Sequence, residues 1–278
     1  MIYDVITYNG EEELFEIRYN ILKDVVDEFR VIEFDKTFSG KSKEKLFDQH
    51  YDKVRNFFVP ESDWGMYKDV ALSSPNTEYG KGAEHWVREF CQKESIKDCL
   101  VDLQDNDILF IGDCDEVWHP SLAHYSPHTS HKLGLLVYSY YLNNKSSEEF
   151  YGTLFTEYGI IKDKCLNHVR SQSNYHELIP NAGWHFTSMG GYERVRQKLT
   201  DSYTEDSYAK PVVIDNLESN INSNKDFLGR NFTYTVDTSL WPQYLKDNMD
   251  KYKHLLSPTL EGVPQKEPIA HVHCGVGE

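Results

Sequence analysis

The first 34 residues constrain the fold most strongly, because their apolar pattern changes period twice. Residues 2–8 form a short apolar stretch that ends at an Asn-Gly pair, as a buried strand does before a turn. Residues 11–24 then place apolar side chains at every third or fourth position after an acidic first turn, and residues 29–34 return to a strand pattern. A strand, a helix and a strand within about 35 residues predict a βαβ unit, and therefore a parallel sheet.

The rest of the chain continues to alternate between strand and helix patterns. Residues 108–111 form a continuous apolar run, too short for a helix and closed by Gly112, which is typical of a central strand covered on both faces. No internal repeat, low-complexity tract or linker interrupts the chain, so a single α/β domain over residues 1–278 is predicted. Further strands are expected at 133–142 and 151–161, helices at 84–97, 190–200 and 241–256, and a loop at 60–82.

The charge balance narrows the classes of function. The 278 residues carry a net charge of −16, and an acidic surface repels phosphate backbones and anionic lipids, so neither nucleic acid nor a membrane surface is an expected partner. No run of about 18 apolar residues is present, so no transmembrane segment is expected. The N-terminus lacks the features of a signal peptide, and the five cysteines are scattered and odd in number. These features predict a cytoplasmic protein with reduced thiols.

Two carboxylates directly follow the apolar run at 108–111. Asp113 and Asp115, with Glu116 adjacent, come just past the end of this predicted strand, and ligands of open α/β sheets bind at the carboxyl ends of the strands. Hard divalent cations such as Mg²⁺ take carboxylate oxygens together with substrate phosphates. A second D-x-D triplet, at 105–107, precedes the strand and is expected to be a turn. The pattern by itself fits a metal–diphosphate site and a solvated pair of carboxylates equally well.

A series of short motifs runs in order over roughly residues 3–250. They are residues 3–9 (YDVITYN), 14–18 (LFEIR), 31–33 (VIE), 37–41 (TFSGK), 86–92 (WVREFCQ), 113–116 (DCDE), 183–186 (GWHF) and 244–248 (YLKDN). No single motif is decisive, but in this joint order they resemble glycosyltransferase family 17.

The resemblance implies a GT-A-type, Rossmann-like α/β fold with a mostly parallel central sheet. Residues 1–118 would form a nucleotide-sugar-binding half and residues 119–278 an acceptor-side half. The implied reaction is an inverting transfer from a UDP-sugar to a glycan acceptor, with N-acetylglucosamine, the sugar of the family's best-known member, as the expected sugar. Mn²⁺ or Mg²⁺ bound at Asp113 and Asp115 would neutralise the charge of the UDP leaving group.

Candidates for the catalytic base come from the acceptor side. Inversion needs a carboxylate that accepts the proton of the acceptor hydroxyl. Glu205 and Asp206 follow the Trp-His segment and are the proposed bases, with a solvated acidic turn as the alternative interpretation. Asp226 is a further candidate.

The Trp-His segment supplies candidates for sugar and metal contacts. Trp184 offers an apolar face to a sugar ring, and His185 is a candidate to ligate the metal or to contact phosphate. Core packing and a hydrogen-bonded histidine are the alternatives. His271 and His273 would share one face of an extended chain and could complete the metal site, if residues 271–273 are not a disordered tail.

Candidates for nucleotide contacts come from the first half. Arg88 and Gln92 lie four residues apart on the predicted helix and share a face, which would approach the nucleotide or be solvated. Thr7, Asn9 and Glu33 lie at the ends of the first two predicted strands and are candidates for uridine and ribose contacts.

Two other classes of function stay open. A nucleotidyltransferase also uses acidic metal ligands on an α/β sheet, but it would release pyrophosphate, and the chain has no glycine-rich phosphate loop. A non-catalytic glycan-binding protein would fit the 19 tyrosines and 5 tryptophans, although aromatic side chains more often fill a core. Since the chain starts directly at the first strand, we expect a bacterial or viral relative that acts in the cytoplasm.

Overall fold

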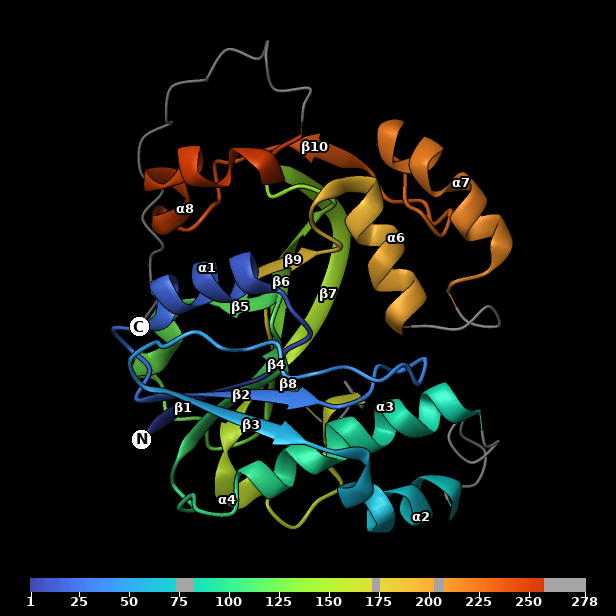
Figure 1. The fold of residues 1–278 in the computed structure, drawn as a ribbon. Helices are drawn as coiled ribbons and strands as arrows, with labels where there is room; N and C mark the ends of the chain where they lie inside the picture. The colour runs from blue at the N-terminus through green and yellow to red at the C-terminus, as the bar shows by residue number, and fades with distance from the viewer. Residues whose placement is uncertain (74–82, 172–175, 203–207, 258–278) are drawn as a thin grey trace.

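The computed structural model describes residues 1–73, 83–171, 176–202 and 208–257. Within them, a curled and mostly parallel ten-stranded sheet carries helices on both faces (Figure 1). Eight strands follow the order β3-β2-β1-β4-β7-β6-β9-β5, while β10 pairs with β7 and β8 pairs with β6. This mixed α/β architecture is compatible with a Rossmann-like fold, and the predicted fold class is confirmed.

The first half of the sheet contains the predicted parallel unit. Its strands are β1 (Ile2–Thr7), β2 (Glu28–Phe34), β3 (Val54–Val59) and β4 (Ile108–Asp113). The crossover helix α1 (Glu12–Leu22) buries Leu14, Phe15 and Ile17. β1 pairs in parallel with both β2 and β4, which places Thr7 beside Asp113. Because parallel strands end at the same edge, the polar side chains that follow them gather there.

The second half of the sheet mixes antiparallel and parallel pairs. β7 (Asn144–Glu157) runs antiparallel to both β4 and β6 (His131–Ser139). β6 overlaps the predicted strand 133–142, and β7 overlaps the predicted strand 151–161. β7 is longer than predicted and ends at the short helix α4 (Tyr158–Ile161). The remaining strands are β5 (Glu116–Trp118), β8 (Glu177–Ile179), β9 (Gly183–Thr187) and β10 (Tyr234–Val236).

Helices form a layer on each face of the sheet and a third cluster at its end (Figure 1). α1 and α8 (Gln243–Asp247) share one hydrophobic core, and α2 (Gly65–Ser73), α3 (Glu84–Ser95) and α5 (Leu166–Ser171) share the other. α6 (Gly191–Ser202) packs on α7 (Pro211–Asn222) around Val195, Leu199 and Leu217. None of the helices in the described ranges is long and apolar enough to cross a membrane.

Two predicted elements differ from the structure. The predicted loop 60–82 contains a 3₁₀ turn (Glu61–Trp64) and α2, because Trp64, Tyr67 and Ala71 recur at helical spacing and pack into the core. The predicted helix 241–256 is instead α8 followed by a 3₁₀ segment (Met249–Leu255), since the backbone at Asn248 leaves the helical region. The elements additional to the predicted ones are the strands β3, β5, β8, β9 and β10 and the helices α5 and α7.

Candidate active site

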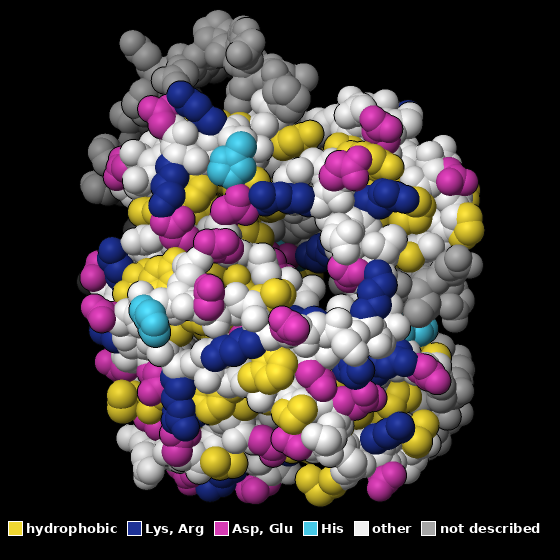
Figure 2. Space-filling view, in the orientation of Figure 1, with side chains coloured by type: hydrophobic (Ala, Val, Ile, Leu, Met, Phe, Trp, Pro, Cys, Tyr) yellow, Lys and Arg dark blue, Asp and Glu magenta, His cyan; other side chains and the backbone are white. Residues whose placement is uncertain are grey.

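A cavity of about 420 Å³ opens at the carboxyl ends of β1 and β4. Its volume falls within the roughly 300–1,000 Å³ typical of small-molecule sites. Figure 2 shows the surface hollowed at this position, with Lys and Arg side chains near the edge. The polar side chains on its walls include Thr7, Asn9, Glu11, Lys43, Glu89, Gln92, Lys93, Asp113, Asp115, Glu116, His185 and Lys198.

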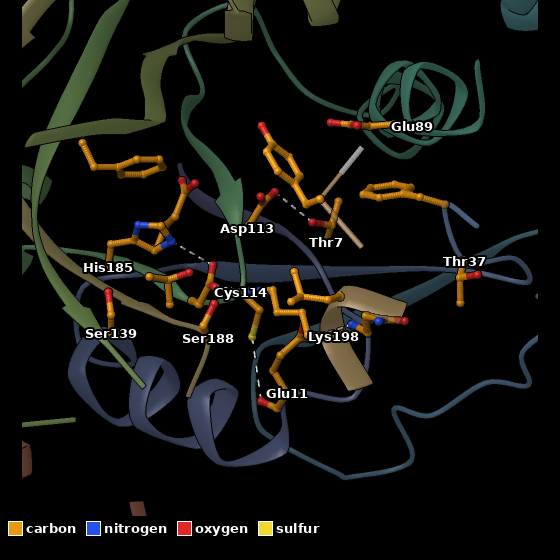
Figure 3. Close-up of a pocket in the computed structure, with 18 of the residues that line it drawn as sticks. Thr7, Glu11, Thr37, Glu89, Asp113, Cys114, Ser139, His185, Ser188 and Lys198 are labelled. Carbon is orange, nitrogen blue, oxygen red and sulfur yellow. Dashed lines mark hydrogen bonds and ion pairs between the residues drawn. The ribbon is translucent and has the colours of Figure 1, made fainter. Parts of the chain in front are cut away.

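Asp113 ends β4, and about half of its side chain is exposed to the cavity. Thr7 Oγ1, from the end of the neighbouring strand, donates a hydrogen bond of 3.1 Å to Asp113 Oδ1 (Figure 3). Arg170 Nη2, from α5, donates to the same oxygen at 3.0 Å. Enclosure raises the pKa of Asp113, but Arg170 and Lys93 outweigh it and hold this pKa below its ordinary value. Asp113 is therefore ionised at neutral pH.

Asp115 lies in the turn between β4 and β5 and is almost completely buried. Lys198 Nζ lies 3.1 Å from Asp115 Oδ2, and His185 Nε2 lies 3.6 Å from Asp115 Oδ1. Burial raises the pKa of Asp115, but the two cations outweigh it and hold this pKa well below its usual range. Burial in turn lowers the pKa of His185, and the Asp115 carboxylate outweighs that effect, so the imidazole stays protonated to higher pH than usual.

A buried ion pair beneath the cavity holds the turn that carries Asp115. Arg18, from α1, donates from Nε and Nη2 to the two carboxylate oxygens of Asp4 on β1, both at 2.6 Å. Its third nitrogen, Nη1, donates to the backbone carbonyls of Asp113, at 3.1 Å, and Glu116. Trp118 Nε1 donates to Asp4 Oδ1 at 2.9 Å. One guanidinium thus connects α1, β1 and both ends of the acidic turn.

Glu116 is buried directly beside the two aspartates. Its Oε2 accepts a hydrogen bond of 2.9 Å from Thr153 Oγ1 on β7. Burial and the negative charge of Asp113 raise the pKa of Glu116 above its ordinary value. Gly112 and Gly152 make room for this carboxylate, because a Cβ at either position would approach Glu116 to 2.7 Å.

The loop after β1 forms the wall on the nucleotide side of the predicted site. Asn9 Oδ1 accepts a hydrogen bond of 2.5 Å from Lys43 Nζ, and the backbone N–H of Asn9 donates to Glu11 Oε2 at 2.6 Å. Gln92, from α3, donates to the Lys36 carbonyl at 2.7 Å. Three of the predicted nucleotide contacts, Thr7, Asn9 and Gln92, therefore line the cavity.

Three other predicted contacts have their side chains elsewhere. Glu33 is buried and accepts hydrogen bonds from the Leu46 and Phe47 amides, at 2.7 and 3.1 Å, so it anchors the loop after β2. Arg88 binds the Phe38 carbonyl and Glu84. None of Glu33, Arg88 and Trp184 lines the cavity.

The side chains of Trp184 and His185 point to opposite faces of the sheet, because the two residues are adjacent on β9. Trp184 packs in the core and donates from Nε1 to the Leu240 carbonyl at 2.7 Å. His185 faces the cavity, with its ring centroid 4.1 Å from that of Phe150. Successive residues of a strand point to opposite faces, so only one of the two can reach the site.

The candidate bases are only partly described. Glu205, Asp206, His271 and His273 lie outside the described residues. Asp226 lines the cavity, but Arg230 Nη2 donates to its Oδ2 at 2.7 Å and the Leu228 and Arg230 amides donate to its Oδ1, each at 3.0 Å. Its oxygens are therefore engaged in local structure.

Three cations around the acidic turn were not predicted from the sequence: Arg18, Arg170 and Lys198. Arg18 lies within one of the motifs that resemble the family, and its place on a predicted buried helix face was a signal that it pairs with a buried acid. Arg170 and Lys198 carry no such signal, because they reach Asp113 and Asp115 from α5 and α6, far along the chain.

A second hollow, of about 740 Å³, lies beside the first residues of β6 and β8. His119, Tyr125 and His131 line it, and Glu177 is the sole carboxylate among its described lining residues. It is not at the carboxyl ends of the parallel strands and has no acidic pair. The first cavity is therefore the candidate active site.

The donors at the first cavity fit a divalent cation that also binds substrate phosphates. Across the described ranges, no three His, Cys, Asp or Glu side chains are grouped as a ready metal cage. Two ionised carboxylates, Asp113 and Asp115, do face one space, and Mg²⁺ is typically held by one or two carboxylates with phosphates and water supplying the rest.

The family comparison agrees with this site. The family model described as Glycosyltransferase family 17 matches residues 1–189, about two thirds of the chain, including Asp113, Asp115 and His185. The chain belongs to glycosyltransferase family 17 and is a glycosyltransferase, so it acts on a sugar donor and an acceptor. No curated protein matches the chain. Membership of this family favours a transferase over the nucleotidyltransferase and glycan-binding alternatives.

Proposed function

We propose that this glycosyltransferase transfers a sugar from a UDP-sugar to a glycan acceptor, with inversion at the anomeric carbon and N-acetylglucosamine as the expected sugar. The observation that carries the proposal is the pair Asp113 and Asp115 at the carboxyl ends of the strands, facing a cavity of about 420 Å³. Ligands of open α/β sheets bind at this edge. A GT-A-type site for a nucleotide sugar, as the family suggests, would occupy the same position.

Asp113 and Asp115 would hold Mn²⁺ or Mg²⁺, with His185 as the third proposed ligand. Their lowered pKa values keep both aspartates negative at neutral pH, as a metal requires. His185 must lose its proton to ligate the metal, whereas the protonated imidazole suits a phosphate oxygen. When bound, the cation would stabilise the charge that develops on the UDP leaving group.

The chain's own side chains prepare the site for this chemistry. Thr7 orients the Asp113 carboxylate through its hydrogen bond, and Arg18 fixes the backbone on both sides of Asp115. Thr7, Asn9 and Gln92 are the proposed nucleotide contacts, since all three line the cavity.

The proposed base is Glu205 or Asp206, which directly follow α6 in the chain. Several carboxylates on the described cavity wall already hold cations: Glu148 and Asp226 bind Arg230, and Glu89 binds Lys93. A base must accept a proton from the acceptor hydroxyl, and a carboxylate held by a guanidinium accepts one less readily.

The direct test is UDP release from a panel of UDP-sugars, with and without Mn²⁺. We expect metal-dependent release from one donor and a loss of roughly a thousandfold in Asp113→Asn and Asp115→Asn, which remove the proposed metal ligands. Asp105→Asn is the matched control. Asp105 belongs to the other D-x-D triplet, is largely exposed and pairs with Lys162, so its replacement should leave the rate unchanged.

Two results would count against the proposal. Release of pyrophosphate instead of UDP would identify a nucleotidyltransferase. Donor turnover that is equal in wild type and in both aspartate variants would remove Asp113 and Asp115 from the mechanism.

A further inference from the structure

The two aspartates of the acidic turn are held by cations of very different kinds. Arg170 is nearly buried on α5, does not line the cavity, and binds Asp113 at 3.0 Å. Lys198 projects from α6 into the cavity wall, has 40% of its side chain exposed, and binds Asp115 at 3.1 Å. The cation on Asp113 is thus part of the scaffold, whereas Lys198, which together with His185 holds Asp115, reaches the space where substrate would lie.

The side chains of Arg170 and Lys198 also differ in flexibility. A guanidinium forms a planar, fixed fork, whereas an ammonium is a point charge on a flexible stem with four methylene groups. The base of the Lys198 stem is fixed, because Val195 and Leu199 on either side of it are buried between α6 and α7. Its amino group can therefore change partners while the helix stays in place.

Asp115 needs a cation at all times, because its side chain is only 9% exposed. An ionised carboxylate buried without a partner is strongly destabilising. A divalent cation at Asp113 and Asp115 would take over this role. The metal would then displace the ammonium of Lys198 from Asp115 at the moment when a diphosphate, which needs cations, arrives beside it.

We propose that Lys198 is the resident counter-ion of Asp115 and moves to the diphosphate of the donor when the metal and nucleotide bind. The proposal rests on the proposed function. In it, Lys198 competes with the metal in the empty site and binds phosphate in the loaded site. Loss of its charge therefore has opposite effects on the affinities for the two ligands.

The test measures two affinities by calorimetry in wild type, Lys198→Met, Lys198→Arg and a control, Lys145→Met. Lys145 pairs with Asp237 at 3.3 Å and does not line the cavity. Without nucleotide, Lys198→Met should bind Mn²⁺ about tenfold more tightly than wild type, because a competing cation is gone. At saturating Mn²⁺, the same variant should bind UDP about tenfold more weakly, because a phosphate contact is lost.

Lys198→Arg keeps the positive charge and should bind UDP close to wild type, and Lys145→Met should match wild type in both measurements. A variant that is merely misfolded would lose affinity for both ligands, so a rise in Mn²⁺ affinity cannot come from structural damage.

The two proposals fail in distinguishable ways. If wild type binds UDP in the presence of Mn²⁺, but Lys198→Met shows no gain in Mn²⁺ affinity or no loss of UDP affinity, the role of Lys198 is wrong and the transferase site stands. If wild type binds no UDP with Mn²⁺ present, the proposed function and the role of Lys198 both fall.

Discussion

The ion pairs Asp4–Arg18 and Asp115–Lys198 both join a carboxylate to a cation at the acidic turn, but they differ in burial and in function. Asp4 and Arg18 are completely buried, and each of the three guanidinium nitrogens donates to an oxygen. Asp115 and Lys198 are 9% and 40% exposed, and both line the cavity. The first pair does not line the cavity, whereas the second pair lies where a ligand would arrive. Access to the cavity, rather than the charges themselves, distinguishes scaffold from site.

The largest expected effect is on the buried pair. Arg18→Met leaves Asp4 as a buried charge without its partner, which should lower the free energy of unfolding by about 3–5 kcal/mol. Arg194→Met is the matched control, because the Arg194–Glu13 pair lies at the surface, partly exposed, and should contribute no more than about 1 kcal/mol. Urea denaturation monitored by circular dichroism measures both. Equal losses in the two variants would contradict the contrast between buried and exposed pairs.

Lys132 differs from both pairs, because it is a buried cation whose hydrogen bond goes to a neutral partner. Its Nζ donates to the Gly152 carbonyl at 2.8 Å, and burial, assisted by Arg170, lowers the pKa of Lys132 to about 8. Between this pH and the ordinary value of 10.5, the unfolded chain keeps the proton that the folded chain has released. The contribution of Lys132 to the free energy of unfolding therefore rises by about 3 kcal/mol as the pH rises from about 8 to 10.5.

The measurement for Lys132 is the free energy of unfolding at pH values from 7 to 10.5. The difference between wild type and Lys132→Met should move in favour of wild type as the pH rises above about 8. Parallel curves for the two proteins would show that Lys132 has an ordinary pKa in the folded state.

The smallest of these effects is expected at Glu33, a predicted nucleotide contact that is instead a buried anchor. In Glu33→Gln, an amide group replaces an oxygen that accepts a backbone hydrogen bond, which should cost about 2 kcal/mol of stability. Faster hydrogen exchange at the Leu46 and Phe47 amides should accompany the loss. Glu44→Gln, at an exposed position of the same loop, is the control. A nucleotide contact would instead give unchanged exchange and weaker UDP binding.

The strands β1, β2 and β4 of the parallel half and the place of the acidic turn were predicted from the sequence, because each depends on local pattern, whereas β3 was not predicted. An apolar run followed by Asp113 and Asp115 indicates a strand and its carboxyl end without any knowledge of the partners. The alternation of side chains along β9 could also have predicted that only one of Trp184 and His185 faces the site, since adjacent strand residues point to opposite faces and the apolar one enters the core.

The partners of the aspartates could not be predicted in the same way. Arg170 and Lys198 reach the turn from helices that are separated from it by 57 and 83 residues, and only the packing of α5 and α6 brings them there. For Glu33 the position was predicted but the contact was not. Its place at the end of β2 was correct, but the loop that follows the strand folds back and occupies its carboxylate.

The proposed function requires that metal and nucleotide bind together at Asp113 and Asp115. The measurement to make is a crystal structure of the protein with Mn²⁺ and UDP, with anomalous scattering to locate manganese. We expect one manganese peak within bonding distance of Asp113 or Asp115, with the UDP diphosphate bound to it and the uridine near Thr7 and Asn9. UDP in the second hollow beside His119 and His131, with no manganese at either aspartate, would contradict it.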